Sequence, residues 1–261
     1  MATLFDVDAG TVLDLDATSE DSTGASPTTS SVWANRVTSP ADGQAQTDHD
    51  FTNTGFTWSG TAGDVTGKWV SPETGNYMLL SNPQGLLANI GRTDTATTFT
   101  IGLRVKWKNG GNRYQEIFNS KRGNDTNQHD GFYWSILNNT TMYFGNRQGG
   151  VNSSGTGSMS VSLIDGSTYN IFLSVNVSAG TTKYGAFLDG DSVALASTSG
   201  TNFTAGSNPA ENVLMGINRV LNGATSFELN AEITQFYVSQ TPLTDALASD
   251  VIDAWKARAG L

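Results

Sequence analysis

The sequence predicts an all-β fold, a sandwich of two antiparallel sheets with one short helix at its C-terminal end. Short segments in which apolar and polar residues alternate recur from residue 99 onward, and turn residues separate them. Glycine contributes 29 of 261 residues and hydrophobic residues only 37%, which is typical of many short strands with one polar face. Twelve phenylalanines, seven tyrosines and six tryptophans are enough to fill a sizeable core. Helical periodicity is confined to the C-terminal end.

The N-terminal segment, residues 1–20, contains two similar pieces, FDVDAG and LDLDAT. Apolar and acidic residues alternate in both, which predicts an edge strand whose carboxylates face water. Polar loops are expected at 19–31 and 39–55, and neither is biased enough to be an interdomain linker. Three tryptophans of this irregular N-terminal third are expected either to cap the open end of the sandwich or to present an aromatic patch to a partner: Trp33, Trp58 and Trp69.

The first clear strand signal is FTIGLRVKW at 99–107, where apolar residues alternate with polar residues and glycine. This alternation predicts a half-buried strand. The dipeptide Asp189-Gly190 lies between two strand-like runs and predicts a tight hairpin turn. Further strands are expected at 114–122, 130–137, 141–146, 167–178, 181–197, 212–219 and 227–238.

A single amphipathic helix is expected after Pro242. Thr244 is placed to cap its N-terminus, and Asp245 lies in the first turn, where the helix dipole favours a negative charge. Gly260 is placed to end it. Because its apolar side chains form one stripe, the helix is expected to lie against the β-structure and close it. The stripe consists of Leu247, Val251, Ile252 and Trp255.

Composition excludes several classes of function. The net charge is −10 and the pI about 4.5, and only 14 lysines and arginines are spread along the chain. Nucleic acids and anionic membranes need clustered basic residues, so neither is an expected partner. The absence of cysteine excludes disulfides, thiolate–metal sites and thiol catalysis.

The first residues, MATLFDVDAG, lack the basic start and the apolar run of a secretory signal. No stretch approaches the roughly 20 apolar residues of a membrane span, so no membrane insertion is expected. We therefore expect synthesis in the cytoplasm without a signal peptide, followed by a role on a virion or outside the cell. A signal that was removed from the sequence is the alternative.

Seven segments, taken in their order, carry a family resemblance: 11–18, 99–107, 114–137, 141–147, 167–176, 183–193 and 233–261. Together they resemble the laminin-G-like, concanavalin A-like lectin and glucanase jelly-roll superfamily. The resemblance covers nearly the whole chain and implies one jelly-roll domain over residues 1–261. This fold is used by lectins, glycan-binding modules, glycoside hydrolases, polysaccharide lyases and structural domains, so fold alone assigns no function.

Catalysis is not expected. Glycan hydrolysis needs two carboxylates that flank the scissile bond, and glucanases of this superfamily carry them in a pattern like E-x-D-x-E, which is absent. The blocks that would signal a polysaccharide lyase are also missing, and His49 and His129 both lie in polar loop sequence. The nearest carboxylate pairs are expected to be solvated: Asp6/Asp8, Asp14/Asp16 and Asp189/Asp191.

No cofactor is expected, with calcium as the one metal to weigh. Oxygen ligands from loops suit this ion, and some proteins with this fold hold calcium at a rim of the sandwich. The loop GNDTNQHDG offers such ligands within seven residues, although asparagine and aspartate are also ordinary turn formers. The candidate ligands are Asn124, Asp125, Asn127 and Asp130.

Glycan binding needs aromatic faces for stacking and planar polar groups for hydroxyls. Strand alternation predicts that several such side chains line one polar sheet face. The same face fits an ordinary solvated surface or a subunit contact equally well. The candidates are Arg104, Lys106, Gln115, Asn119, Tyr133 and Tyr143.

The function expected from these patterns is a non-enzymatic, surface-exposed structural or adhesion module of a bacteriophage virion, such as a capsid decoration or tail appendage. Its partners would be other virion subunits or cell-surface glycans, bound weakly and strengthened by multivalency. The alternative is a secreted carbohydrate-active enzyme, either glycoside hydrolase or polysaccharide lyase, or its carbohydrate-binding module. A third reading is a homo-oligomeric scaffold whose sheet faces are covered by neighbouring subunits.

Overall fold

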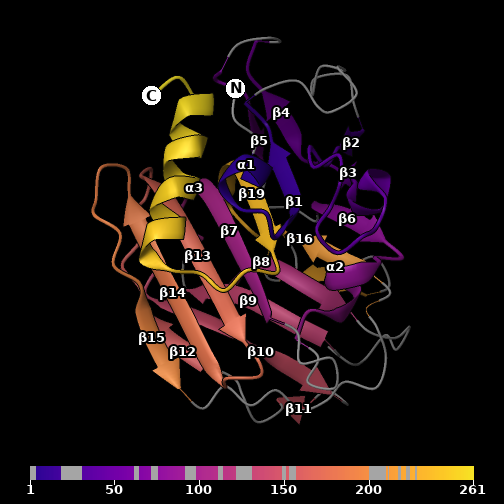
Figure 1. Cartoon of the computed structure of the whole chain (residues 1–261). Helices are drawn as coiled ribbons and strands as arrows, with labels where there is room; N and C mark the ends of the chain where they lie inside the picture. The colour runs from indigo at the N-terminus through magenta and orange to yellow at the C-terminus, as the bar shows by residue number, and fades with distance from the viewer. Residues whose placement is uncertain are drawn as a thin grey trace.

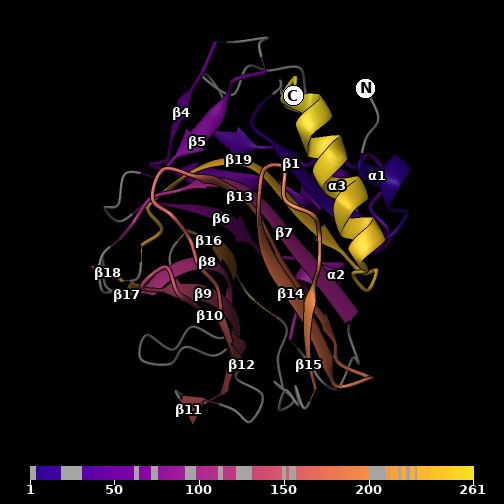
Figure 2. The same ribbon diagram turned by 90° about the vertical axis from the view of Figure 1, so that its left-hand side faces the viewer.

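A computed structural model gives the arrangement of the chain. It describes residues 4–18, 31–61, 65–71, 76–91, 98–110, 114–121, 131–148, 151–152, 157–199, 210, 212–216, 219–221, 224–226 and 228–261. Two large antiparallel sheets face each other, and the C-terminal helix lies on the outer side of one of them (Figures 1 and 2). The predicted all-β fold with two antiparallel sheets and one short C-terminal helix is therefore confirmed.

The sheet beneath the helix, here called sheet A, has eight strands in the order β15-β14-β13-β7-β19-β5-β4, and β1 also pairs with β19. Its central strands β13, β7 and β19 are long and paired in antiparallel register over most of their length. The strands of sheet A are β1 (Thr11–Asp16), β4 (Thr57–Ser59), β5 (Lys68–Val70), β7 (Thr98–Trp107), β13 (Thr168–Asn176), β14 (Thr181–Leu188), β15 (Ala196–Ser199) and β19 (Ala231–Ser239).

The opposite sheet, sheet B, has nine strands in the order β11-β10-β9-β8-β16-β6-β3-β2, and β12 pairs with β10. Its strands are β2 (Val32–Trp33), β3 (Phe51–Thr54), β6 (Tyr77–Ser81), β8 (Tyr114–Lys121), β9 (Gly131–Leu137), β10 (Thr141–Gln148), β11 (Val151–Asn152), β12 (Gly157–Ser160) and β16 (Asn212–Met215). The remaining elements are the pair β17 (Arg219–Leu221) and β18 (Ala224–Ser226), the short helices α1 (Leu4–Val7), η1 (Gln46–His49) and α2 (Gly85–Asn89), and the terminal helix α3 (Asp245–Arg258).

The main core lies between the two sheets and is rich in aromatic side chains. Trp107 from β7 and Trp134 from β9 are fully buried there. Trp33 and Trp69 also belong to this core, with ring centroids 6.2 Å apart, and Trp58 packs against it while its indole donates to the Ala17 carbonyl oxygen. The described residues of the N-terminal third thus include strands of both sheets, and these tryptophans lie in the core or, for Trp58, pack against it rather than form an exposed patch.

A second apolar layer lies between sheet A and α3. Trp255 of the helix stacks on Phe172 of β13, with ring centroids 5.5 Å apart and planes inclined by 4°. Thr244 caps the helix as predicted, because its hydroxyl oxygen accepts the Leu247 amide, and Gly260 follows its end with a φ of 70°. Among the described residues, no helix is long and apolar enough to cross a membrane.

The helix covers a face of β7 that the alternation assigned to solvent. Thr100 and Arg104 are buried, and Lys106 is the exposed exception. The expectation of a half-buried strand is therefore wrong, because a central strand under a helix is buried on both faces. The predicted Asp189-Gly190 turn is present, but β14 and β15 are joined through residues 189–195 before their antiparallel pairing begins.

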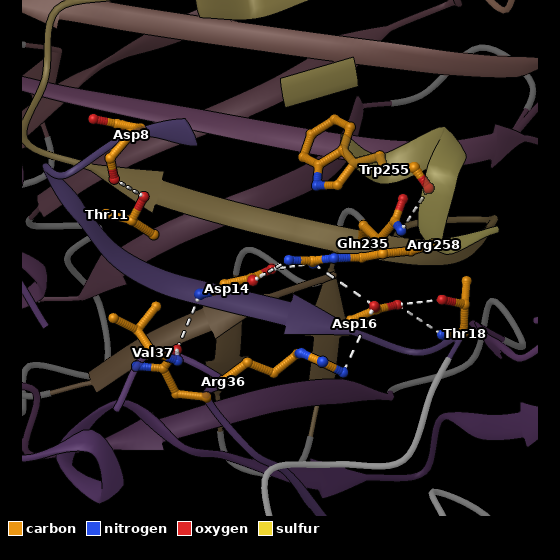
Figure 3. A network of polar contacts seen from close by, with 11 residues as sticks. Asp8, Thr11, Asp14, Asp16, Thr18, Arg36, Val37, Gln235, Trp255 and Arg258 are labelled. Atoms are coloured by element: carbon orange, nitrogen blue, oxygen red, sulfur yellow. Dashed lines mark hydrogen bonds and ion pairs between the residues drawn. The ribbon is translucent and has the colours of Figure 1, made fainter. Parts of the chain in front are cut away.

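The carboxylates of β1 are buried, which corrects the expectation of a solvated edge strand. Arg258 at the end of α3 makes a bidentate pair with Asp14, at 2.8 and 2.7 Å (Figure 3). Asp16 lies 3.6 Å from the same guanidinium and 3.8 Å from Arg36. Burial alone would lower the pKa of Arg258, but the hydrogen bonds and charge of Asp14 outweigh it and raise that pKa. This network of ion pairs holds β1 against the end of α3.

Candidate functional site

A β-bulge in β8 decides which side chains share the outer face of sheet B. The register between β8 and β9 shifts between Glu116 and Phe118, and both Ile117 and Phe118 are buried in the core. A bulge places two residues against one, so the face of every later residue is reversed. As a result Glu116 and Asn119, three positions apart, lie on the same outer face of the sheet.

The outer face carries rows of side chains across β10, β9 and β8. In one row, Tyr143 lies opposite Ser135, and Ser135 lies opposite Glu116. In the next row, Gly145 lies opposite Tyr133, and Tyr133 lies opposite Asn119. We call this surface the tyrosine face and define it by Tyr114, Glu116, Asn119, Tyr133, Ser135 and Tyr143.

Two tyrosines form the accessible part of the tyrosine face. Tyr114 and Tyr143 are half-buried, and their rings meet edge to face with centroids 5.4 Å apart and planes at 62°. Glu116 and Ser135 on the same face are 1% and 2% exposed. The described part of this face therefore offers a pair of half-buried aromatic rings as its accessible surface, which fits a ligand that stacks on them.

The structure brings three of the six predicted glycan ligands together and separates the other three. Asn119, Tyr133 and Tyr143 share the tyrosine face, as predicted. Gln115 does not, because it precedes the bulge and faces inward opposite the core residue Ile136. Its side chain accepts the Asn230 amide at 2.7 Å and donates to the Lys108 carbonyl oxygen at 3.1 Å, which ties the two sheets together.

Arg104 and Lys106 lie on the outer face of sheet A, so the expectation of one shared face is wrong for them too. Arg104 is buried and forms a bidentate pair with Asp189, with both distances 2.6 Å, and a 3.0 Å bond to Asn170. Burial opposes ionisation of Asp189, but hydrogen bonds from Arg104 and Asn170 outweigh it and lower its pKa. The guanidinium group of Arg104 is therefore bound by Asp189 and Asn170 of the protein itself, whereas the Lys106 side chain is exposed.

The four candidate calcium ligands, Asn124, Asp125, Asn127 and Asp130, lie outside the described residues, so that site stays a prediction. His129 lies outside them as well. Within the described ranges, no group of three or more histidine and acidic side chains could hold a metal ion.

The carboxylate pairs considered for hydrolysis are not arranged as acid and base. Asp14 and Asp16 are held by Arg258, and Asp16 also accepts the Thr18 amide at 2.9 Å. Asp8, likewise buried, accepts hydrogen bonds from the Tyr237 and Thr241 hydroxyls. Asp6 and Asp191 are exposed, as expected for solvated acids.

Sequence alternation missed Tyr114, Glu116 and Ser135 as members of the face. The signal that could have found them is the adjacent apolar pair Ile117-Phe118 inside an otherwise alternating strand. Two consecutive buried residues in a strand are what a bulge produces. If this pair is taken as a bulge, Glu116 is predicted on the same outer face as Asn119, and Gln115 is predicted to face the core.

Comparison with known proteins yields structural likeness only. No family model and no curated protein matches the sequence. Among solved structures, the binding domain of botulinum neurotoxin serotype D/C VPI 5993 superposes with a TM-score of 0.61 at 11% identity, over 97% of this chain and 53% of that one. The likeness shows the fold alone.

Two related structures give similar values. The binding domain of botulinum neurotoxin DC in complex with SialylT has a TM-score of 0.55 at 12% identity, over 97% of this chain and 52% of that one. A structure described by the dependence of type C neurotoxin cell entry on two ganglioside molecules has a TM-score of 0.59 at 12% identity, over 98% and 53%. The chain thus spans about half the length of the solved structures it matches, and what it shares with them is a β-sandwich fold.

Proposed function

We propose that this chain is a non-enzymatic glycan-binding module and that the tyrosine face is its binding surface. The observation that carries the proposal is the edge-to-face pair of the half-buried Tyr114 and Tyr143 on the outer face of sheet B. Sugar rings stack on aromatic side chains through their C–H groups, and neighbouring polar groups accept hydroxyl hydrogens. A shallow site of this kind binds weakly, so multivalent display supplies the affinity.

The structural neighbours support this proposal in outline. They include binding domains of botulinum neurotoxins, one of them in complex with SialylT, and a structure described by the dependence of type C neurotoxin cell entry on two ganglioside molecules. Gangliosides carry sugar head groups, so a glycan-binding role is the function that the fold likeness favours.

The positions of the carboxylates favour a glycan-binding function over glycoside hydrolysis. Glycoside hydrolysis needs two carboxyl groups that flank one bond. On the described part of the tyrosine face, Glu116 has no second carboxylate beside it, and the pair Asp14/Asp16 is bound to Arg258 on the far side of the sandwich. We therefore propose a binding module and not an enzyme.

For the biological context we propose a laminin-G-like jelly-roll domain over residues 1–261, displayed on a bacteriophage virion as a capsid decoration or tail appendage. A cysteine-free chain needs no oxidative folding to persist outside a cell, and a net charge of −10 keeps it soluble. Other virion subunits or further copies of the chain would supply the multivalency. Mass spectrometry of the purified bacteriophage virions that encode this chain tests the proposed context. Absence of the chain from these virions would contradict it.

The binding proposal is tested on an array of bacterial surface polysaccharides and gangliosides, probed with a streptavidin-clustered form of the protein. Tyr143→Ala and Tyr114→Ala are expected to weaken binding at least about tenfold, or ~1.4 kcal/mol, because each removes stacking surface. The control is Tyr184→Ala, which removes a half-buried tyrosine from β14 in sheet A. Equal losses in all three variants, or silence across the array, would contradict the proposal.

A further inference from the structure

A concave surface lies at the β3 end of sheet B, several strands away from the tyrosine face. It is a groove of about 570 Å³, which falls within the range of roughly 300–1,000 Å³ typical of small-molecule sites. Strands β3 and β6 and the η1 turn contribute its walls. The lining residues are Gln44, Thr47, Asp48, Asp50, Thr52, Leu80, Ser81, Asn82 and Gln84.

Strand alternation explains the polar wall of the groove. Phe51 and Leu80 are buried in the core, so their neighbours Thr52 and Ser81 point to the outer side of the sheet. Both hydroxyl side chains are exposed. These two hydroxyl groups are therefore presented by regular strands, which hold them more rigidly than loops do.

Hydrogen bonds to backbone amides fix the two carboxylates of the groove. Asp48 accepts the Ala45 amide at 3.1 Å, and Asp50 accepts the Asn35 amide at 2.7 Å. Between them His49 is fully buried and contacts Asp42 at 3.2 Å, which anchors the η1 turn from behind. The carboxylates thus have defined positions before any ligand arrives, and such preorganisation reduces the entropic cost of binding.

The chemical groups that line the groove indicate which class of ligand it can bind. Carboxylate, amide and hydroxyl groups surround the groove, and among its lining residues there is no lysine, arginine or aromatic side chain. An anionic ligand would meet the carboxylates of Asp48 and Asp50 in a lining that offers it no lysine or arginine, on a protein of net charge −10. Carboxylates accept hydrogen bonds only, so they match a ligand rich in hydroxyl donors.

We propose that this groove is a binding site for a neutral, hydroxyl-rich ligand, namely an uncharged hexose unit. The site recognises hydroxyl groups through Asp48, Asp50 and the amides of Gln44 and Gln84, without aromatic stacking. It is separate from the tyrosine face and does not depend on that face binding glycans.

The test is a titration of the isotope-labelled full chain with the methyl α-glycosides of glucose, mannose and galactose, followed by amide chemical shifts. Sodium glucuronate serves as the anionic counterpart. A neutral glycoside is expected to shift amides of residues 47–52 and 81–84, and glucuronate is expected to leave them unchanged. Thr52→Arg, which fills the groove with a charged side chain, is expected to weaken binding at least about tenfold.

The matched control is Thr54→Arg, which places the same side chain on the same face of β3 at an exposed position outside the groove. It is expected to bind as the unmodified chain does, and unchanged spectra elsewhere show that both variants are folded. Absence of shifts with all three neutral glycosides, equal effects of the two variants, or equal binding of glucuronate would overturn the inference. Shifts confined to the tyrosine face would overturn it while supporting the proposed function.

Discussion

At the scale of single residues, Gly102 shows how one position in β7 admits the terminal helix. A Cβ atom built on Gly102 would lie 2.8 Å from Phe172, closer than real Cβ contacts, and 3.0 Å from Trp255, which is tighter than most of them. The stacked pair of Phe172 and Trp255 therefore occupies the space that any larger residue would need. The glycine is required by close packing and not by its backbone conformation.

Replacement of Gly102 by alanine is expected to lower the free energy of unfolding by about 1–3 kcal/mol, because the added methyl group overpacks the layer under α3. Urea denaturation measures the change. The double variant Gly102→Ala/Phe172→Leu is expected to recover part of the loss, since leucine vacates the space of the ring. Additive losses in the double variant would show that the two residues do not compete for space.

At the scale of elements, the pairing of β1 with α3 joins the two ends of the described chain. The pair of Arg258 and Asp14 is almost fully buried, with both side chains 1% exposed. A buried ion pair contributes little net stability relative to apolar packing, but removal of one partner leaves a charge in a medium that cannot solvate it. The pair therefore favours this one docking of the helix over alternatives.

Arg258→Met is expected to destabilise the protein by about 3–5 kcal/mol, because Asp14 is then buried without a partner. The double variant Asp14→Leu/Arg258→Met is expected to recover most of this loss. Lys256→Met serves as control, because it removes a positive charge from the same last turn of α3 without touching Asp14, and a change within about 0.5 kcal/mol is expected. Thermal or urea unfolding measures all three, and equal losses for Arg258→Met and Lys256→Met would contradict the role of the pair.

At the scale of the whole molecule, several carboxylates in different parts of the fold titrate below their ordinary pKa. Burial raises the pKa of Asp42, but hydrogen bonds from His49 and the Leu86 amide outweigh it and lower that pKa below 3.8. Burial likewise opposes ionisation of Glu232, and Lys68 and Lys108 lower its pKa below 4.5. Asp189 behaves in the same way beside Arg104.

Because these folded-state pKa values lie below the unfolded ones, the stability that the carboxylates contribute is present above about pH 4.5 and is lost as the pH falls through the folded-state values. Urea denaturation at pH 7, 4 and 3 is expected to show a flat upper range and a decline in the acid range. Asp42→Asn is expected to reduce the decline, because it removes one titrating group. A free energy of unfolding that is unchanged down to pH 3 would contradict the assignment.

Local pattern was sufficient for much of the fold. Residues 99–107, 114–122 and 130–137 were each expected as strands, and β7, β8 and β9 match them closely. The N-cap at Thr244 follows from chemistry within one helical turn. Such features depend on near neighbours in the chain, so the sequence is enough to predict them.

Three of the six residues predicted for the glycan-binding face could not be placed correctly by strict alternation along a strand. Strict alternation along β8 puts Gln115 with Asn119, and the bulge at Ile117 separates them. Alternation along β7 likewise puts Arg104 toward solvent, where α3 and the Asp189 segment cover it. For Arg104 the deciding contacts come from residues far away in the sequence, whereas the bulge has a local signal in the pair Ile117-Phe118.

The sequence by itself determined the all-β class, the positions of most strands from residue 99 onward and the one C-terminal helix, because periodicity and capping are local. Only the tertiary structure decided which face of each sheet is covered and that Asp14 is buried against Arg258. It also decided that Tyr114 of β8 contacts Tyr143 of β10 across the intervening strand β9. The physical reason is that burial depends on which segments distant in the chain pack together, and residue order within a single strand does not encode that choice.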